Sequence, residues 1–345
     1  MTRSEFLRLL AACGAGVGVG LWPRPAAAQE PPWPAGDGAS TTDALVLGSL
    51  VIDGLVSPHR RVGLPRSAGE AKRLTGIDAG CFRVQSVDDL SAVGAFVDRY
   101  GEILMRIDAT SDLEQARTSG RLGLIFYAER VWPLAGSLEP LARWHAAGLR
   151  VLQIADEGTN ELGGGYDRDD VALTPFGRRV VAELNRLKIA IDVSHCGKRT
   201  TLDVAARSSR PVLARHGNAA SLAPHERNKS DEELAAVART GGVVAISILG
   251  RYLRRSEGAT ASLGDFVAQI DHAVQRLGID HVGLCSDSLL DGEPVYAYDR
   301  SSSDLNSLRR WFHVAAALRA KGYADDALRQ LLGLNFLRAY REALG

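Results

Sequence analysis

Residues 188–195 read Lys-Ile-Ala-Ile-Asp-Val-Ser-His, and residues 211–216 read Pro-Val-Leu-Ala-Arg-His. Each stretch is a short apolar run of the kind that forms a buried strand, and each ends in a histidine, His195 or His216. In a (β/α)8 barrel, side chains at the carboxyl ends of different strands meet at one mouth of the barrel. The two histidines, one strand and helix unit apart, therefore favour a barrel with a metal site at its mouth.

Short β-branched runs alternate with longer helical patterns along the rest of the chain, which is typical of βα units. Several helical patterns begin at capping sequences: Thr174 precedes a proline, and Ser111 with Glu114 and Ser230 with Glu233 have capping-box spacing. Eight strands argue for a closed α/β barrel, the TIM barrel. They are predicted near residues 44–53, 79–86, 121–128, 149–155, 188–194, 211–215, 241–248 and 280–286.

Length and composition place the chain among globular proteins with one large domain. It has 345 residues, 46% of them hydrophobic and 24% charged, and its formal net charge is +0. No basic stripe is present, which excludes a nucleic-acid partner. Four widely spaced cysteines do not form a disulfide framework. We expect a single barrel domain over residues 43–345, including a helical tail.

The first residues have the pattern of an export signal. Arg3 and Arg8 precede an apolar, glycine-rich stretch, and residues 26–28 are three alanines suited to cleavage. We expect residues 1–28 to be an export signal, resembling either a twin-arginine or a general secretory signal, and residues 29–42 to be a flexible leader. The signal is too short to span a bilayer. The expected protein is exported, periplasmic, and without an integral membrane span after cleavage.

Polar residues follow five of the predicted strands and should converge at the barrel mouth: Glu129, Asp156, His195, His216 and Asp287. Two imidazoles and one carboxylate form the ligand set of a hydrolytic zinc site with one open position. Zinc would activate a water molecule there and polarise a carbonyl group. Asp287 is then the expected catalytic proton acceptor.

Arg227 lies in the loop that follows His216. Arginine pairs bidentately with carboxylates, so Arg227 is a candidate anchor for a terminal carboxylate of the substrate. A surface position in the loop is the alternative for this residue.

Several segments together resemble the membrane dipeptidase (renal dipeptidase) family of zinc metallopeptidases, in its order and spacing. The resemblance extends over about residues 43–343. The segments are Leu-Thr-Pro-Phe-Gly (173–177), Ile-Asp-Val-Ser-His (191–195), His-Gly-Asn (216–218), His-Glu-Arg-Asn (225–228), Gly-Gly-Val (241–243) and Gly-Leu-Asn-Phe-Leu-Arg (333–338).

The resemblance implies a barrel of the metal-dependent amidohydrolase type and hydrolysis of dipeptides, with a D-residue tolerated on the carboxyl side. In the family, a glutamate and a water bridge two zinc ions. The roles implied for this chain are metal ligation by Glu129, His195 and His216, an aspartate near the first zinc at Asp287, and substrate binding by Arg227, Asp156 and Asn218. Asp156 stands where the family usually has a substrate-binding histidine.

The chain departs from the family at its first strand. The family motif there is Asp-Gly-His-Asn-Asp, whose histidine and last aspartate hold the first zinc. This chain reads Asp-Gly-Leu-Val-Ser, with Leu55 and Ser57 at the ligand positions, as in a divergent bacterial branch. We therefore expect one zinc per chain and a weakened or absent second site. His59 is the nearest residue that would restore a ligand.

Two other functions remain open from the sequence. Loss of the ligands at Leu55 and Ser57 favours a catalytically inactive or weak barrel that binds a small peptide-like ligand, whereas survival of the three other ligands favours an enzyme. A hydrolase of another amide or lactam is the third interpretation. The sequence leaves both a homodimer and a monomer open.

Overall fold

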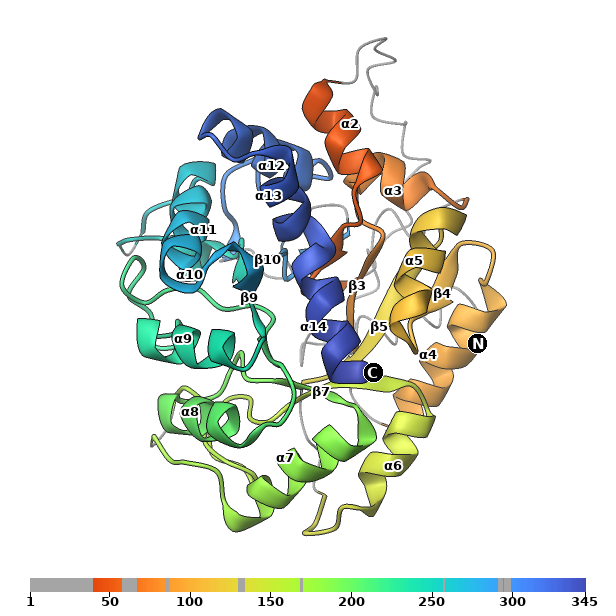
Figure 1. Cartoon of the computed structure of the whole chain (residues 1–345), viewed down its shortest axis with the longest axis vertical. Coiled ribbons are helices and arrows are strands. Elements are labelled where there is room, and N and C mark those ends of the chain that lie inside the picture. The colour runs from red at the N-terminus through yellow and green to blue at the C-terminus, as the bar shows by residue number, and fades with distance from the viewer. Residues whose placement is uncertain are drawn as a thin grey trace, which may run out of the picture.

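The computed structural model describes residues 40–57, 67–84, 87–129, 134–167, 170–256, 258–290, 294 and 299–345. They form a parallel barrel surrounded by helices (Figure 1). The strands are β1 (Ile52–Asp53), β2 (Val56–Ser57), β3 (Ala79–Val84), β4 (Leu104–Arg106), β5 (Leu122–Ala128), β6 (Leu149–Gln153), β7 (Ala190–Asp192), β8 (Val212–Ala214), β9 (Val243–Ser247), β10 (Val282–Cys285) and β11 (Ser288–Leu289).

The sheet runs in the order β1-β3-β5-β6-β7-β8-β9-β10, with every pairing parallel and β4 paired to β5. The backbone N–H of Gly54 donates to the carbonyl of Leu284 at 3.0 Å, and β2 pairs with β11. These contacts join the first and last strands of the sheet. The predicted (β/α)8 TIM barrel is confirmed.

Helices follow most of the strands and cover the outside of the barrel (Figure 1). They are α2 (Thr41–Gly48), α3 (Glu70–Thr75), α4 (Val87–Arg99), α5 (Thr110–Ser119), α6 (Glu139–Ala146), α7 (Pro175–Leu187), α8 (Lys198–Arg207), α9 (Asp231–Arg239), α10 (Gly250–Leu253), α11 (Leu263–Leu277), α12 (Arg310–Ala320), α13 (Asp325–Arg329) and α14 (Asn335–Leu344), with a 3-10 turn at Ile279–His281 and a π turn at Gln330–Leu334.

The strand predicted over residues 44–53 is wrong for most of its length. Residues 41–48 form α2, which Ser40 caps by accepting a hydrogen bond from the N–H of Asp43 at 3.1 Å. Only Ile52 and Asp53 belong to a strand. The helix also takes in the last two residues of the expected leader. The export signal over residues 1–28 and the leader up to residue 39 lie outside the described residues.

Two of the three predicted helix starts are confirmed. Thr174 accepts from the N–H of Gly177 at 2.9 Å, and Ser230 and Glu233 form the expected reciprocal capping box. The start predicted at Ser111 is wrong, because the N-cap of α5 is Ala109, two residues earlier. The carboxylate of Asp112 accepts there from the N–H groups of residues 108 and 109.

The C-terminal helix α14 covers the end of the barrel where the strands begin, since Arg338 donates to the carbonyl of Gly241 and Arg210 donates to the carbonyl of Glu342, and its buried side chains join the inner core. Phe336 and Tyr340 are fully buried in the cluster that holds the inward side chains of the strands, and the Tyr340 hydroxyl lies 3.1 Å from the Cys81 sulfur. Figure 1 shows α14 crossing the centre of the ring of helices. A second cluster fills the layer between strands and outer helices. The barrel interior is thus packed and leaves polar side chains only toward the strand ends.

Asp53 connects the first and last strands of the barrel. Its Oδ1 accepts from the backbone N–H of Ser286 at 2.8 Å and of Leu55 at 3.2 Å, while its buried Oδ2 has no hydrogen-bond partner among the described residues. Burial raises the pKa of Asp53 to about 6, against the opposing charge of Arg310 and these hydrogen bonds. Above that pH the buried carboxylate is charged, and its charge lowers the stability of the fold.

Asp53→Asn is expected to change the pH dependence of stability. Between pH 3.8 and about 6 the folded chain binds more protons at Asp53 than the unfolded chain does, so this group lowers stability as pH rises through that window. Asparagine lacks this effect. The free energy of unfolding of the variant, relative to wild type, should rise by roughly 2.4 kcal/mol between pH 4 and pH 7.5. Urea unfolding at both pH values measures it; an unchanged difference would contradict it.

Among the described helices, none combines the length and apolar character needed to cross a membrane.

Candidate metal centre

Alternation along the strands determines which side chains enter the barrel. Ala79 and Cys81 of β3, and Ile125 and Tyr127 of β5, belong to the inner core cluster. Because successive side chains of a strand point to opposite faces, the next inward positions are 83 and 129. They are occupied by Arg83 and Glu129, which form an ion pair at the barrel mouth.

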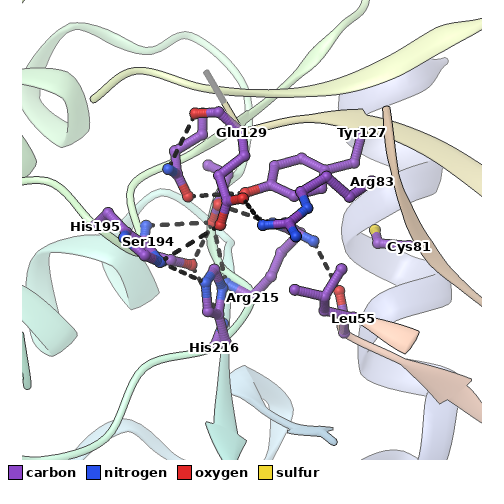
Figure 2. Close-up of polar contacts among 12 residues, drawn as sticks. Leu55, Cys81, Arg83, Tyr127, Glu129, Ser194, His195, Arg215 and His216 are labelled. Atoms are coloured by element: carbon purple, nitrogen blue, oxygen red, sulfur yellow. Dashed lines mark hydrogen bonds and ion pairs between the residues drawn. The ribbon is translucent and has the colours of Figure 1, made fainter. Parts of the chain in front are cut away.

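Glu129, His195 and His216 bring their ligand atoms together at the mouth (Figure 2). The two Nε2 atoms of the histidines lie 2.9 Å apart, and Glu129 Oε1 lies 3.7 Å from His195 Nε2. The three ligand atoms all lie within 4.8 Å of one another. The sequence-based expectation that these residues converge is therefore met in the structure.

The donor set fits a zinc ion. Two imidazole nitrogens and one carboxylate are the ligands of hydrolytic zinc sites, and a tetrahedral ion at usual bond lengths separates its ligand atoms by about 3.3 Å. The observed separations of 2.9 and 3.7 Å lie on either side of that value. Small side-chain adjustments would bring all three atoms to bonding distance.

His216 is held in the neutral form that a metal ligand requires. Its side chain is buried, and burial together with the positive charge of Arg227 lowers the pKa of His216 well below its usual value. Its Nε2 is thus available as a donor to a metal ion at neutral pH.

Asp156 lies behind His195. Its Oδ1 is 3.0 Å from Nδ1 of His195, the ring nitrogen that faces away from His216. Carboxylates in this position fix the orientation and tautomer of a metal-binding imidazole. The geometry favours an orienting role for Asp156, whereas its expected contact with substrate stays a prediction.

Asp192 and Ser194 fix the strand ends that carry both histidines. Asp192 Oδ1 accepts from the Ser194 hydroxyl at 2.7 Å and from the N–H of Arg215 at 3.1 Å. The Ser194 oxygen accepts in turn from the N–H of His216 at 3.2 Å. These bonds connect the ends of β7 and β8, and so set the relative position of the two imidazoles.

Arg215 lies beneath the histidines inside the barrel and has no exposed surface. It pairs with the equally buried Asp192 at 3.1 Å, donates to the carbonyl of Gly54 at 2.8 Å, and stacks 3.4 Å from the ring centre of Tyr127. The sequence analysis missed both charged residues. The sequence feature that could have revealed them is a charged residue at an inward position of an otherwise apolar strand.

Asp287, the predicted proton acceptor, follows β10, is partly buried and has a backbone φ of 45°. This left-handed conformation is uncommon outside glycine, although aspartate tolerates it better than most residues. Burial raises its pKa, and the nearby charge of Glu129 acts in the same direction, against Arg227. The charges of the centre thus act on Asp287, and its carboxyl takes up a proton more readily than usual.

Arg227 is 1% exposed, so its alternative as a surface loop residue is excluded. Its Nη2 lies 3.4 Å from His195 Nε2, and its guanidinium lies 4.2 Å from the ring centre of Tyr252. The buried Nε and Nη1 atoms have no hydrogen-bond partner among the described residues. Donors left unpaired beside the ligand cluster suit an anionic group of a substrate.

The Asn218 side chain is bound by backbone groups, and its expected substrate contact stays a prediction. The Asn218 amide donates to the carbonyls of Ser247 and Tyr252, each at 3.1 Å, and accepts from the N–H of Ser247 at 2.8 Å. The side chain has no exposed surface. These bonds occupy both N–H donors of the amide and connect Asn218 to the end of β9 and to Tyr252.

The first strand supplies no metal ligand among the described side chains. Leu55 is buried at 6% exposure near the other members of the inner core, and Ser57 belongs to β2 by its backbone pairing. His59, the candidate replacement, lies outside the described residues. Within the described ranges, Glu129, His195 and His216 are the only cluster of three or more potential metal ligands.

Comparison with known proteins agrees with this geometry. The sequence profile of the membrane dipeptidase family (peptidase family M19) matches residues 82–344. Dipeptidase tcpJ of Claviceps purpurea is 27% identical over 266 residues, which cover 75% of this chain and 59% of the fungal protein. The chain thus spans about three fifths of the length of that relative.

Solved structures share the fold. An amidohydrolase from Pseudomonas aeruginosa superposes with a TM-score of 0.78 at 24% identity, covering 88% of this chain and 99% of that one. A metallopeptidase from Rhodobacter sphaeroides, bound to a phosphinate mimic of L-Ala-D-Ala, has a TM-score of 0.74 at 22% identity, with coverages of 86% and 99%. The barrel is therefore the one seen in these hydrolases.

Proposed function

The chain belongs to the membrane dipeptidase family of metallopeptidases (peptidase family M19), and from this premise we propose that it hydrolyses dipeptides at a zinc centre formed by Glu129, His195 and His216. The observation that carries the proposal is the convergence of these three ligand atoms next to the unpaired donors of Arg227. One side of the centre supplies metal ligands, and the other supplies a cation for the substrate.

Zinc in this centre would lower the pKa of a bound water to about 7 and polarise the amide carbonyl. The chain's own residues do the rest. Arg227 holds the terminal carboxylate of the dipeptide through its free Nε and Nη1 donors, and so aligns the amide bond with the centre. Asp287, with its raised pKa, accepts a proton from the attacking water and passes it to the leaving amine.

Asp156 keeps His195 in the orientation that presents Nε2 to the ion. His216 contributes as a neutral donor, because burial prevents its protonation. We propose one zinc per chain, in line with the single ligand cluster of the described residues.

The test compares a dipeptide with its C-terminal amide. Zinc-loaded protein should hydrolyse L-Ala-L-Ala or L-Ala-D-Ala with a kcat/KM at least about 100-fold above that for the corresponding amide, because each charge-assisted hydrogen bond to Arg227 contributes about 1.5–3 kcal/mol. Arg227→Gln should remove this preference by slowing cleavage of the free acid.

Arg251→Gln is a matched control. Arg251 also stacks on Tyr252, at 4.7 Å, but it pairs with Asp299 at 2.8 Å. Its substitution should leave the preference for the free acid in place. Absence of turnover for every dipeptide, despite bound zinc, would reject the peptidase proposal in favour of a binding protein; turnover of a cyclic amide alone would favour a lactam hydrolase.

A further inference from the structure

The two oxygens of the Glu129 carboxylate have different partners. Oε1 faces the histidines, 3.7 Å from His195 Nε2, whereas Oε2 forms an ion pair with Nη1 of Arg83. Figure 2 shows the two contacts reaching the carboxylate from opposite sides. One oxygen is therefore available to a metal ion beside the histidines, and the other is already neutralised by a side chain of the protein.

Arg83 is held in this position by the barrel. It lies on β3 at the inward position after Cys81, and in the sheet register it is the partner of Tyr127. Tyr127 donates to Gln153 at 2.9 Å, and Gln153 donates to the backbone carbonyl of Glu129 at 3.1 Å. The side chains of Arg83 and Glu129 are 30% and 12% exposed. Both ends of the ion pair are thus fixed by neighbouring strands.

A guanidinium in this place has a definite chemical consequence. A carboxylate that bridges two metal ions gives one oxygen to each, with the ions about 3.5–4 Å apart. A guanidinium is always charged, donates hydrogen bonds and has no lone pair for a metal. On the Oε2 side of Glu129, Arg83 therefore provides the positive charge that a second ion would otherwise bring, and it repels such an ion.

We infer that Arg83 is a built-in cation that takes the place of a second metal ion at Glu129, so that the centre binds one divalent ion and uses Glu129 as a ligand through Oε1 only. This inference rests on the proposed metal centre. Arg83 is a positioning residue in this scheme, because it acts through the glutamate. Leu55, buried and apolar in the inner core, offers no ligand that would compete for the ion.

Metal stoichiometry tests the inference directly. The full chain is stripped of metal, equilibrated with increasing Zn²⁺ up to 1 mM, and analysed by calorimetric titration and by metal content after gel filtration. Wild type should saturate at one zinc per chain. This measurement needs no variant: two zinc ions per chain would overturn the inference while supporting the metal centre, and no bound zinc would overturn the proposed function as well.

Charge reversal at the same position gives the second measurement. Arg83→Glu places two carboxylates side by side, so binding should rise from one zinc to two per chain, whereas Arg83→Lys keeps the charge and should stay at one. Arg106→Glu is the matched control, because Arg106 ends the neighbouring β4 and pairs with Asp108 outside the centre; it should stay at one. An Arg83→Glu protein that still binds one zinc with wild-type affinity would overturn the inference.

Discussion

Zinc binding and dipeptide hydrolysis should both be lost when His216 is replaced by alanine. His216 supplies one of the three ligand atoms that converge among the described residues, and its neutral, buried imidazole is matched to the ion. Removing even the partner of a metal ligand typically costs 10- to 100-fold in metal affinity or activity. Loss of the ligand itself should lower both zinc affinity and activity by more than about 100-fold. Zinc titration measures the affinity, and kcat/KM on a dipeptide measures the activity.

A smaller loss of zinc affinity and activity is expected at Asp156, which contacts His195. Asp156→Asn keeps every ligand but weakens the orientation of His195, so it should fall within the 10- to 100-fold range, below the effect at His216. His272→Ala is the matched control. His272 pairs with Asp231, and neither residue belongs to the ligand cluster, so zinc affinity should stay unchanged. If His216→Ala bound zinc with wild-type affinity, the proposed centre would be wrong.

Replacing Arg215 by methionine is expected to destabilise the fold by about 3–5 kcal/mol. Arg215 and Asp192 are both fully buried, so the substitution leaves the Asp192 carboxylate without its charge partner inside the barrel. It also removes the bond to the carbonyl of Gly54 and the stacking on Tyr127. Urea unfolding of the metal-free protein measures the loss without the stabilising effect of bound zinc.

Two comparisons identify the origin of this loss. Arg178→Met breaks a surface ion pair with Asp203 and should cost less than about 1 kcal/mol. The double variant Asp192→Asn with Arg215→Met no longer contains an isolated buried charge, so it should be more stable than the sum of the two single losses implies. A loss below 1 kcal/mol for Arg215→Met would show that the pair is not needed for stability.

The sequence predicts the barrel because the apolar runs alternate with helical patterns. The prediction of individual elements fails where a run is short or fits both helix and strand. The apolar run from Ala44 to Leu47 has no periodicity that separates helix from strand, and the cap at Ser40 decided for a helix. The strand β4 was missed because Leu104–Arg106 is only three residues long. Local pattern carries too little information in both places.

The candidate centre was predictable to the extent that it depends on strand ends. Glu129, His195 and His216 converge because parallel strands deliver their ends to one mouth. Arg83 was overlooked because its meaning depends on a neighbour 46 residues away in the chain. The hydrogen bonds of Asn218 could not be predicted, because nothing in the sequence reveals that its amide contacts three backbone groups.

The contacts that join Asp53 and Gly54 to residues 284–286 have a consequence for how the chain folds. They link segments more than 200 positions apart, with Ser286 and Asp53 separated by 233. Such distant contacts form late and slowly, because the intervening chain must first lose its freedom. Until then, β1 and β10 present unpaired backbone edges that attract other chains. Refolding should therefore be slow, and its yield should fall as protein concentration rises.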